Sequence, residues 1–138
     1  MKVIEMIDLS IDMFVDLEPV DDKICGCLID PMYTTGEIRL GAFKNIHDGG
    51  SIHDVFVFTN KRIFAINVQD STGKANVSFF PYKEITTFSV GTEGTNLDNG
   101  RSKKLEIWSS AFGNVKFMFV GHVNINNICR MMSECIVT

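Results

Sequence analysis

Short apolar runs separated by tight turns fill the middle of the chain, and this pattern constrains the fold more than any other feature of the sequence. Residues 55–59 and 62–68 are rich in valine, isoleucine and phenylalanine, which favour strands over helices. Two residues, Asn60 and Lys61, separate these runs, and a two-residue connection joins neighbouring antiparallel strands. The sequence therefore predicts a tight hairpin here.

Similar runs continue on both sides of this hairpin. The other predicted strands are residues 37–43, 75–82, 84–92, 104–110 and 114–120, with Pro81 near the break between two of them. Consecutive hairpins favour an antiparallel meander, and a meander of this length must curl or close to bury its apolar face. We therefore expect a mainly β domain with one open end that needs a cover.

A switch to helical periodicity marks the C-terminal end of the chain. Within residues 122–137 the apolar positions follow one helix face: Ile125, Ile128, Cys129, Met132 and Ile136. Asn124 is the expected N-cap, because its short polar side chain can accept a hydrogen bond from the first turn. We expect this amphipathic helix to cover the opening of the barrel.

The N-terminal segment also shows a helical period, with apolar residues interrupted by acids. We predict an amphipathic helix over residues 2–17 that ends before Pro19 and packs on its own barrel or on a neighbouring subunit. The expected division is residues 1–36 as an N-terminal helical and connector segment and residues 37–138 as the barrel with its C-terminal helix. Adsorption to a membrane is disfavoured, because the polar face of this helix is acidic.

Charge is unevenly distributed along a chain of 138 residues whose net charge is −4. Residues 1–30 contain eight acids and two bases, a net charge of −6, so residues 31–138 carry +2. An acidic N-terminal segment followed by a nearly neutral remainder argues against binding to a nucleic acid polymer or to an anionic membrane. With 45% hydrophobic and 22% charged residues, the composition is typical of one globular domain.

The cysteines indicate a reducing compartment and do not form a recognisable metal motif. Cys25 and Cys27 are one residue apart, unlike the usual two-residue spacing, and Cys129 and Cys135 lie in the apolar C-terminal pattern. The sequence shows no signal peptide and no apolar run of membrane-spanning length. We expect a cytoplasmic protein with reduced thiols, no cofactor, no metal and no transmembrane segment.

Several stretches in a fixed order resemble the bacterial pleckstrin-homology (PH) domain family. They are "GAFK" at 41–44, "DVFVFTNKRIFAIN" at 54–67, "TGK" at 72–74, "PYKEITTFSV" at 81–90, "LEIW" at 105–108 and the C-terminal helix. The resemblance implies a PH-like, strongly bent antiparallel seven-stranded barrel capped by a C-terminal α-helix. It also implies frequent assembly into homo-oligomers, often rings, and no catalytic residues.

The chain departs from the family pattern in an inserted loop that carries His47, Asp48, His53 and Asp54. In eukaryotic relatives this first hairpin loop uses Lys and Arg to bind lipid headgroups, whereas the acids here would repel a phosphoinositide. The four side chains could instead bind a divalent metal or act as an acid–base pair. We favour a polar hairpin loop, because a Gly-Gly loop does not hold ligands in fixed positions.

Cations in the turns are the remaining candidates for a ligand site. The candidate ligand-binding residues are Thr59, Asn60, Lys61, Arg62, Lys74, Arg101, Lys103 and Lys104, and Lys83 is a further turn cation. If several converge in the fold or across a subunit boundary, they can hold a phosphate through charge-assisted hydrogen bonds. The alternative is a set of solvated charges that keep the strand ends soluble.

Functional motifs of enzymes are absent from the sequence. It contains no G-x-S-x-G nucleophile motif and no glycine-rich phosphate loop, so no catalytic residue is assigned. We expect a non-enzymatic bacterial or phage interaction module that forms a homo-oligomer and presents loops to a partner. The alternative is an oligomeric binder of an anionic molecule such as a cyclic or linear nucleotide or another phosphate compound. Binding to phosphoinositides or a membrane surface ranks third.

Overall fold

Eight strands form one sheet in a computed structural model, which describes residues 13–20, 23–45, 52–69, 72–93, 102–121 and 123–137. The strands are β1 (Met13–Pro19), β2 (Arg39–Asn45), β3 (Ile52–Thr59), β4 (Arg62–Gln69), β5 (Lys74–Pro81), β6 (Thr87–Glu93), β7 (Ser102–Ser109) and β8 (Gly113–Phe119). Two α-helices, α2 (Lys23–Ile29) and α3 (Asn126–Val137), and two 3-10 turns, η1 (Asp30–Met32) and η2 (Tyr82–Glu84), complete the described elements.

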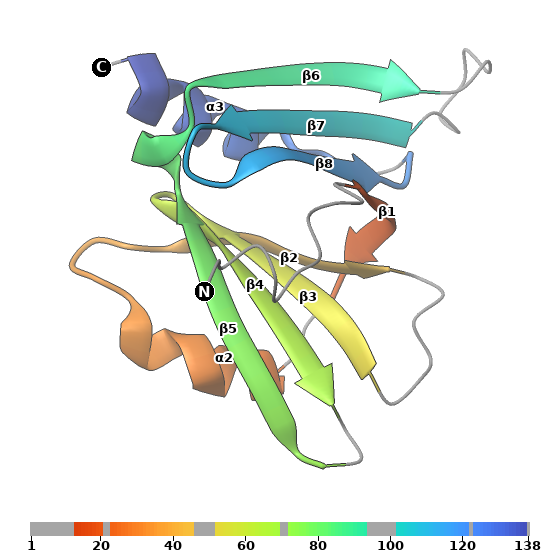
Figure 1. Cartoon of the computed structure of the whole chain (residues 1–138), viewed down its shortest axis with the longest axis vertical. Coiled ribbons are helices and arrows are strands. Elements are labelled where there is room, and N and C mark those ends of the chain that lie inside the picture. Colours follow the sequence, from red (N-terminus) through yellow and green to blue (C-terminus); the bar gives the residue numbers. More distant parts are fainter. Residues whose placement is uncertain are drawn as a thin grey trace.

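The sheet bends into two layers that cross one another (Figure 1). Strands β2 to β5 form one antiparallel meander and β6 to β8 form the other. Strand β1 joins them, antiparallel to β2 and parallel to β8. The strand order is β5-β4-β3-β2-β1-β8-β7-β6, so β5 and β6 are the two outer strands of the described sheet. This confirms the predicted strongly bent, mainly β fold and adds β1 to the seven predicted strands.

The predicted helix over residues 2–17 is wrong where the structure describes it, because residues from Met13 onward form β1. Phe14 and Leu17 both pack in the core, although they are three residues apart. The spacing arises from a bulge, since two residues of β1, Val15 and Asp16, lie opposite one residue of β8, and Asp16 has a φ of 52°. The bulge imitates a helical period. Residues 2–12 of the predicted helix lie outside the described residues, and the N-terminal α-helix that the structure describes is α2.

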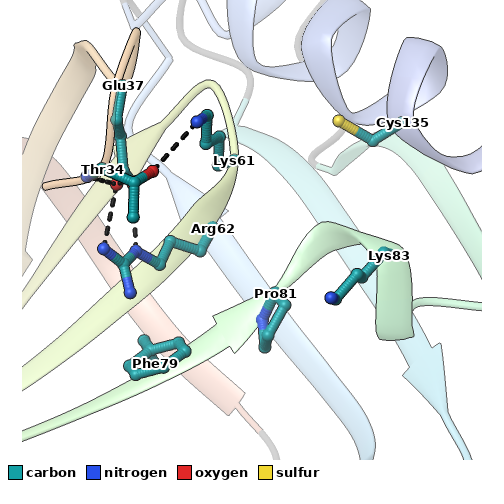
Figure 2. Close-up of a pocket in the computed structure, with 8 residues that line it drawn as sticks. All are labelled: Thr34, Glu37, Lys61, Arg62, Phe79, Pro81, Lys83 and Cys135. Carbon is teal, nitrogen blue, oxygen red and sulfur yellow. Dashed lines mark hydrogen bonds and ion pairs between the residues drawn. The ribbon is translucent and has the colours of Figure 1, made fainter.

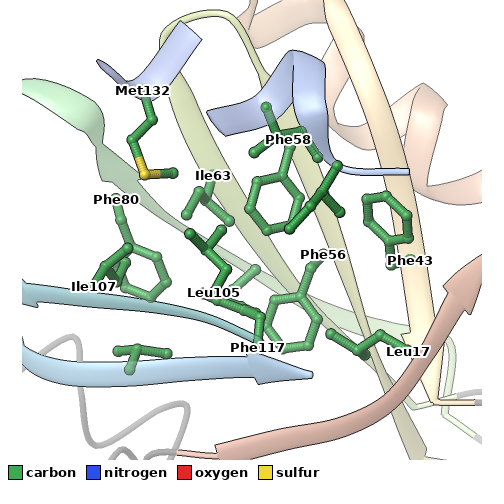
Figure 3. Packing of buried hydrophobic residues seen from close by; sticks show 14 of the residues in the cluster. Leu17, Phe43, Phe56, Phe58, Ile63, Phe80, Leu105, Ile107, Phe117 and Met132 are labelled. Atoms are coloured by element: carbon green, nitrogen blue, oxygen red, sulfur yellow. The ribbon is translucent and has the colours of Figure 1, made fainter. Parts of the chain in front are cut away.

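Phenylalanine side chains from both layers fill the main core (Figure 3). Phe43 packs edge-to-face on Phe119, with ring centroids 4.9 Å apart. Phe56 and Phe58 make similar contacts with Phe117 at 5.3 and 5.4 Å. Such pairs add to the large apolar area that each ring buries, so the aromatic core holds the two layers together.

Each α-helix covers a different part of the sheet. Ile128 and Met132 of α3 are buried in the main core, which confirms the predicted capping helix. Asn124 accepts a 2.9 Å hydrogen bond from the backbone N–H of Asn126 at the start of α3, as expected. Ile29 of α2 belongs to a second apolar cluster with side chains of β2, β3 and β4. No helix among the described residues is long and apolar enough to cross a membrane.

Candidate functional site

A buried carboxylate organises the chain around the β3–β4 turn. Glu37 accepts hydrogen bonds from Arg62 Nε at 3.0 Å and from Arg62 Nη2 at 2.9 Å, one on each carboxylate oxygen. The Thr59 hydroxyl donates to it at 2.7 Å and the Thr34 backbone N–H at 3.0 Å. We call these four residues the Glu37 network, most of which is drawn in Figure 2. It joins the segment before β2 to both strands of the hairpin.

The protonation of Glu37 follows from these contacts. Burial by itself would raise the pKa of this carboxyl group. The hydrogen bonds from Arg62, Thr59 and Thr34, together with the positive charge of Arg62, outweigh burial and lower the pKa from 4.5 to about 2. Glu37 is therefore ionised at neutral pH, and its Arg62 partner is only 12% exposed.

The two residues at the tip of the β3–β4 turn also bind the segment that precedes β2. Asn60 accepts a 2.9 Å hydrogen bond from the backbone N–H of Ile38 and donates to the carbonyl of Gly36 at 3.0 Å. The Lys61 amine donates to the Thr34 hydroxyl at 2.9 Å and to the Thr35 carbonyl at 2.7 Å. These contacts fix the turn, so its polar residues have a structural role within the fold.

Tyr82 and Cys135 connect this region to η2 and α3. The buried Tyr82 hydroxyl donates a 2.6 Å hydrogen bond to the Thr59 carbonyl, and burial raises its pKa. The Cys135 thiol of α3 lies 3.7 Å from the Asn60 carbonyl, and burial also raises the pKa of this thiol. The turn, η2 and α3 are therefore held against one another.

These elements surround a pocket of about 490 Å³. Lys61, Arg62 and Lys83 bring three cations to its lining, and Glu37 brings one carboxylate. Figure 2 shows these side chains around the space, with Phe79 and Pro81 of β5 on one wall and Cys135 of α3 on another. Cations and apolar surface in one cavity suit a small organic anion.

Arg62 is fixed in this pocket by aromatic rings as well as by Glu37. Its guanidinium lies 4.5 Å from the ring centre of Phe64 and 4.6 Å from that of Phe79. Nη2 also donates to the Met32 carbonyl at 2.6 Å. Cation–π contacts and the carboxylate together occupy most of this group, which leaves little of it for a ligand.

The eight predicted ligand residues are divided among different environments. Thr59, Asn60, Lys61 and Arg62 surround the turn, and of these Lys61 and Arg62 line the pocket. Lys74 is exposed at the opposite end of β5 from Pro81. Arg101 lies outside the described residues.

The other two predicted cations, on β7, are not part of the pocket lining. The Lys103 amine donates to the Gly121 and Val123 carbonyls at 2.9 and 2.5 Å. Lys104 lies 3.9 Å from Glu106 in an ion pair. Lys103 thus binds the chain that leads into α3.

Several residues of this region were not predicted from the sequence, above all Glu37, Tyr82, Phe79 and Cys135. Glu37 precedes Arg62 by 25 positions, and nothing in a single sequence pairs two such distant residues. The available signal was the pair of polar residues, Thr59 and Arg62, at the two ends of an apolar hairpin.

The inserted His and Asp loop is only partly described. His47 and Asp48 lie outside the described residues, and the structure does not describe the side chain of His53. Asp54 accepts a 2.9 Å hydrogen bond from the Asn67 side chain across the β3–β4 pair. No group of three or more potential metal ligands occurs among the residues that the structure describes. Cys27, Cys129 and Cys135 are free thiols.

The family model described as "Bacterial PH domain" matches residues 13–136. The chain therefore belongs to the bacterial PH domain family, which confirms the resemblance noted in its sequence.

Two proteins are similar to this chain, and the first of them has a PH domain. The crystal structure of a DUF1696 family protein with a PH domain from Shewanella loihica PV-4 is 27% identical, with a TM-score of 0.63, and the match covers 88% of this chain and 98% of that one. The Bacillus subtilis (strain 168) protein YjqA is 41% identical over 61 residues, which are 43% of this chain and 46% of YjqA. The match thus spans less than half of YjqA.

A more distant solved structure is too dissimilar to indicate a function for this chain. The hSac2 domain of human phosphoinositide phosphatase Sac2 is 12% identical, with a TM-score of 0.40, and the match covers 83% of this chain and 74% of that one. Lipid chemistry is therefore not transferred from it.

Proposed function

We propose that this domain is a non-enzymatic interaction module that forms a homo-oligomer through strand β6 and presents its loops to a partner. The observation that carries the proposal is that β6 is an outer strand of the sheet formed by the described residues. An outer strand has backbone groups along one side that can pair with a strand of another chain.

The two outer strands differ in their protection against such pairing. Strand β5 begins with Lys74 and ends with Pro81, two residue types that protect sheet edges. Strand β6, with the sequence TFSVGTE, contains no proline, lysine or arginine. Its Val90 is 50% exposed. These features favour β6 as the edge at which a second copy adds its strand.

Light scattering after size-exclusion chromatography tests the assembly. At micromolar concentration we expect a mass that is a multiple of 15.5 kDa, and we expect Val90→Lys to yield the monomer. Val137→Lys is the matched control, because Val137 is 78% exposed on α3 and distant in sequence from β6. A monomeric wild type, or dissociation by the control substitution alone, would contradict assembly through β6.

A second candidate function is the binding of a small anionic molecule. The convergence of Lys61, Arg62 and Lys83 on one pocket favours it. No comparable observation favours binding to phosphoinositides or a membrane surface. For the location of the module we propose the cytoplasm, supported by the free thiols of Cys27, Cys129 and Cys135.

A further inference from the structure

The charges in the pocket are unequally compensated. Three cations against one carboxylate leave two positive charges in excess. Arg62 is paired with Glu37, so the excess belongs to Lys61 and Lys83, which have no carboxylate partner among the described residues. Two uncompensated ammonium groups at one cavity attract an anion.

Both ammonium groups retain donors for a ligand. An ammonium has three N–H donors, and Lys61 uses two of them on the neutral oxygens of Thr34 and Thr35. Lys83 is exposed on η2 and makes no hydrogen bond or ion pair with the part of the chain that the structure describes. Figure 2 shows its amine directed toward Pro81, at the edge of the pocket.

Strand β5 supplies an apolar surface to the pocket. Phe79 is 42% exposed, and with Pro81 it forms an apolar wall of the pocket. Because Arg62 already lies over the Phe79 ring, that ring is held in a fixed orientation. A flat ring placed on this wall would cover apolar surface that is otherwise in contact with water.

We propose that the pocket binds a small planar organic anion, with an aromatic or heterocyclic ring against Phe79 and Pro81 and a phosphate or carboxylate between Lys61 and Lys83. The volume of about 490 Å³ suits a molecule of the size of a nucleoside monophosphate. This inference rests on the second candidate function. Inorganic phosphate would leave the apolar wall uncovered, and an inositol headgroup has no flat apolar ring to place there.

Calorimetric titration of the purified chain with the four 5′-ribonucleoside monophosphates, and with benzoate as a carboxylate, tests the proposal. We expect at least one of these probes to bind at least about tenfold more tightly than inorganic phosphate, and any nucleotide that binds to do so at least about tenfold more tightly than its parent nucleoside. Lys83→Glu should weaken binding by at least about tenfold. Lys74→Glu is the matched control, since it makes the same charge change at the far end of β5 and should leave the affinity unchanged.

The outcomes distinguish the planar-ligand inference from the anion-binding function on which it rests. Thermal melting of the variants establishes that they fold, and Phe79→Ala is a second variant, which removes the aromatic part of the apolar wall together with one of the two rings beside Arg62. If inorganic phosphate binds as tightly as the ring-containing anions and depends on Lys83, anion binding stands and the planar-ligand inference is overturned. If no probe binds at millimolar concentration, or if Lys74→Glu weakens binding as much as Lys83→Glu, both are overturned.

Discussion

Glu37→Gln is the substitution that tests most directly how the chain before β2 is held. Glutamine keeps the size of the side chain but removes its charge, so Arg62 keeps its burial without a carboxylate partner. Removing one member of a buried ion pair typically costs about 3–5 kcal/mol, because the other charge remains uncompensated. We expect the free energy of unfolding to fall by an amount near the lower end of this range.

The pKa of Glu37 gives an independent magnitude. Each pKa unit corresponds to about 1.4 kcal/mol, so a fall from 4.5 in the unfolded chain to about 2 in the fold corresponds to about 3 kcal/mol. The folded pKa is the lower one, so this stability is fully present above pH 4.5. It is lost as the pH falls from 4.5 toward 2, while Glu37 takes up a proton.

Urea unfolding at a series of pH values from 7 to 2, followed by circular dichroism, measures both quantities. At pH 7 we expect Glu37→Gln to be about 3 kcal/mol less stable than the wild type. The difference should shrink between pH 4.5 and about 2, where the protonated wild type resembles the variant.

An exposed acid provides the control for general effects of charge. Glu84→Gln removes a carboxylate on η2 that is exposed and makes no hydrogen bond or ion pair with the described residues. It should change stability by less than about 0.5 kcal/mol at every pH. A loss below about 1 kcal/mol for Glu37→Gln at pH 7, or a difference from wild type that does not vary with pH, would refute the reasoning.

Three further predictions concern single groups. Tyr82→Phe removes the donor to the Thr59 carbonyl and should lower the free energy of unfolding by about 1–2 kcal/mol in urea titrations. Gly113→Ala places a Cβ at a φ of 85° in the β7–β8 turn and should cost about 1–2 kcal/mol in the same assay, although no atom within 4 Å obstructs it. Iodoacetamide at pH 7, followed by peptide mass spectrometry, should label exposed Cys27 before Cys135, whose pKa is raised by burial.

The strands were predictable because their signals are local. A tight turn such as Asn60-Lys61 and an alternating apolar pattern both act over a few residues, and the β3–β4 hairpin formed where they indicated it. The prediction was wrong for strand β1 because it relied on the same kind of local signal. Its bulge at Asp16 brings Phe14 and Leu17 to one side, and a window of sequence cannot distinguish that spacing from a helical turn.

The candidate site was predictable only in part, since its contacts join distant positions. The sequence indicated that Lys61 and Arg62 are cations of one turn. It could not indicate which of the two pairs with a carboxylate. The fold pairs Arg62 with Glu37 and leaves Lys61 without a carboxylate among the described residues. Lys74 and Lys103 carry the same charge, yet they are placed elsewhere on the sheet.

The positions of Lys61 and Lys83 depend on residues that do not line the pocket. Lys83 follows Tyr82 directly, and the Tyr82 hydroxyl holds η2 against the carbonyl of Thr59. Thr59 in turn receives the N–H groups of Lys61 and Arg62 on its hydroxyl. Thr59 thus helps to position Lys61 directly and Lys83 through Tyr82. We therefore expect Tyr82→Phe to weaken anion binding in calorimetry, although Tyr82 is not part of the pocket lining. An unchanged affinity in a Tyr82→Phe variant of lowered stability would show that η2 holds its position without this bond.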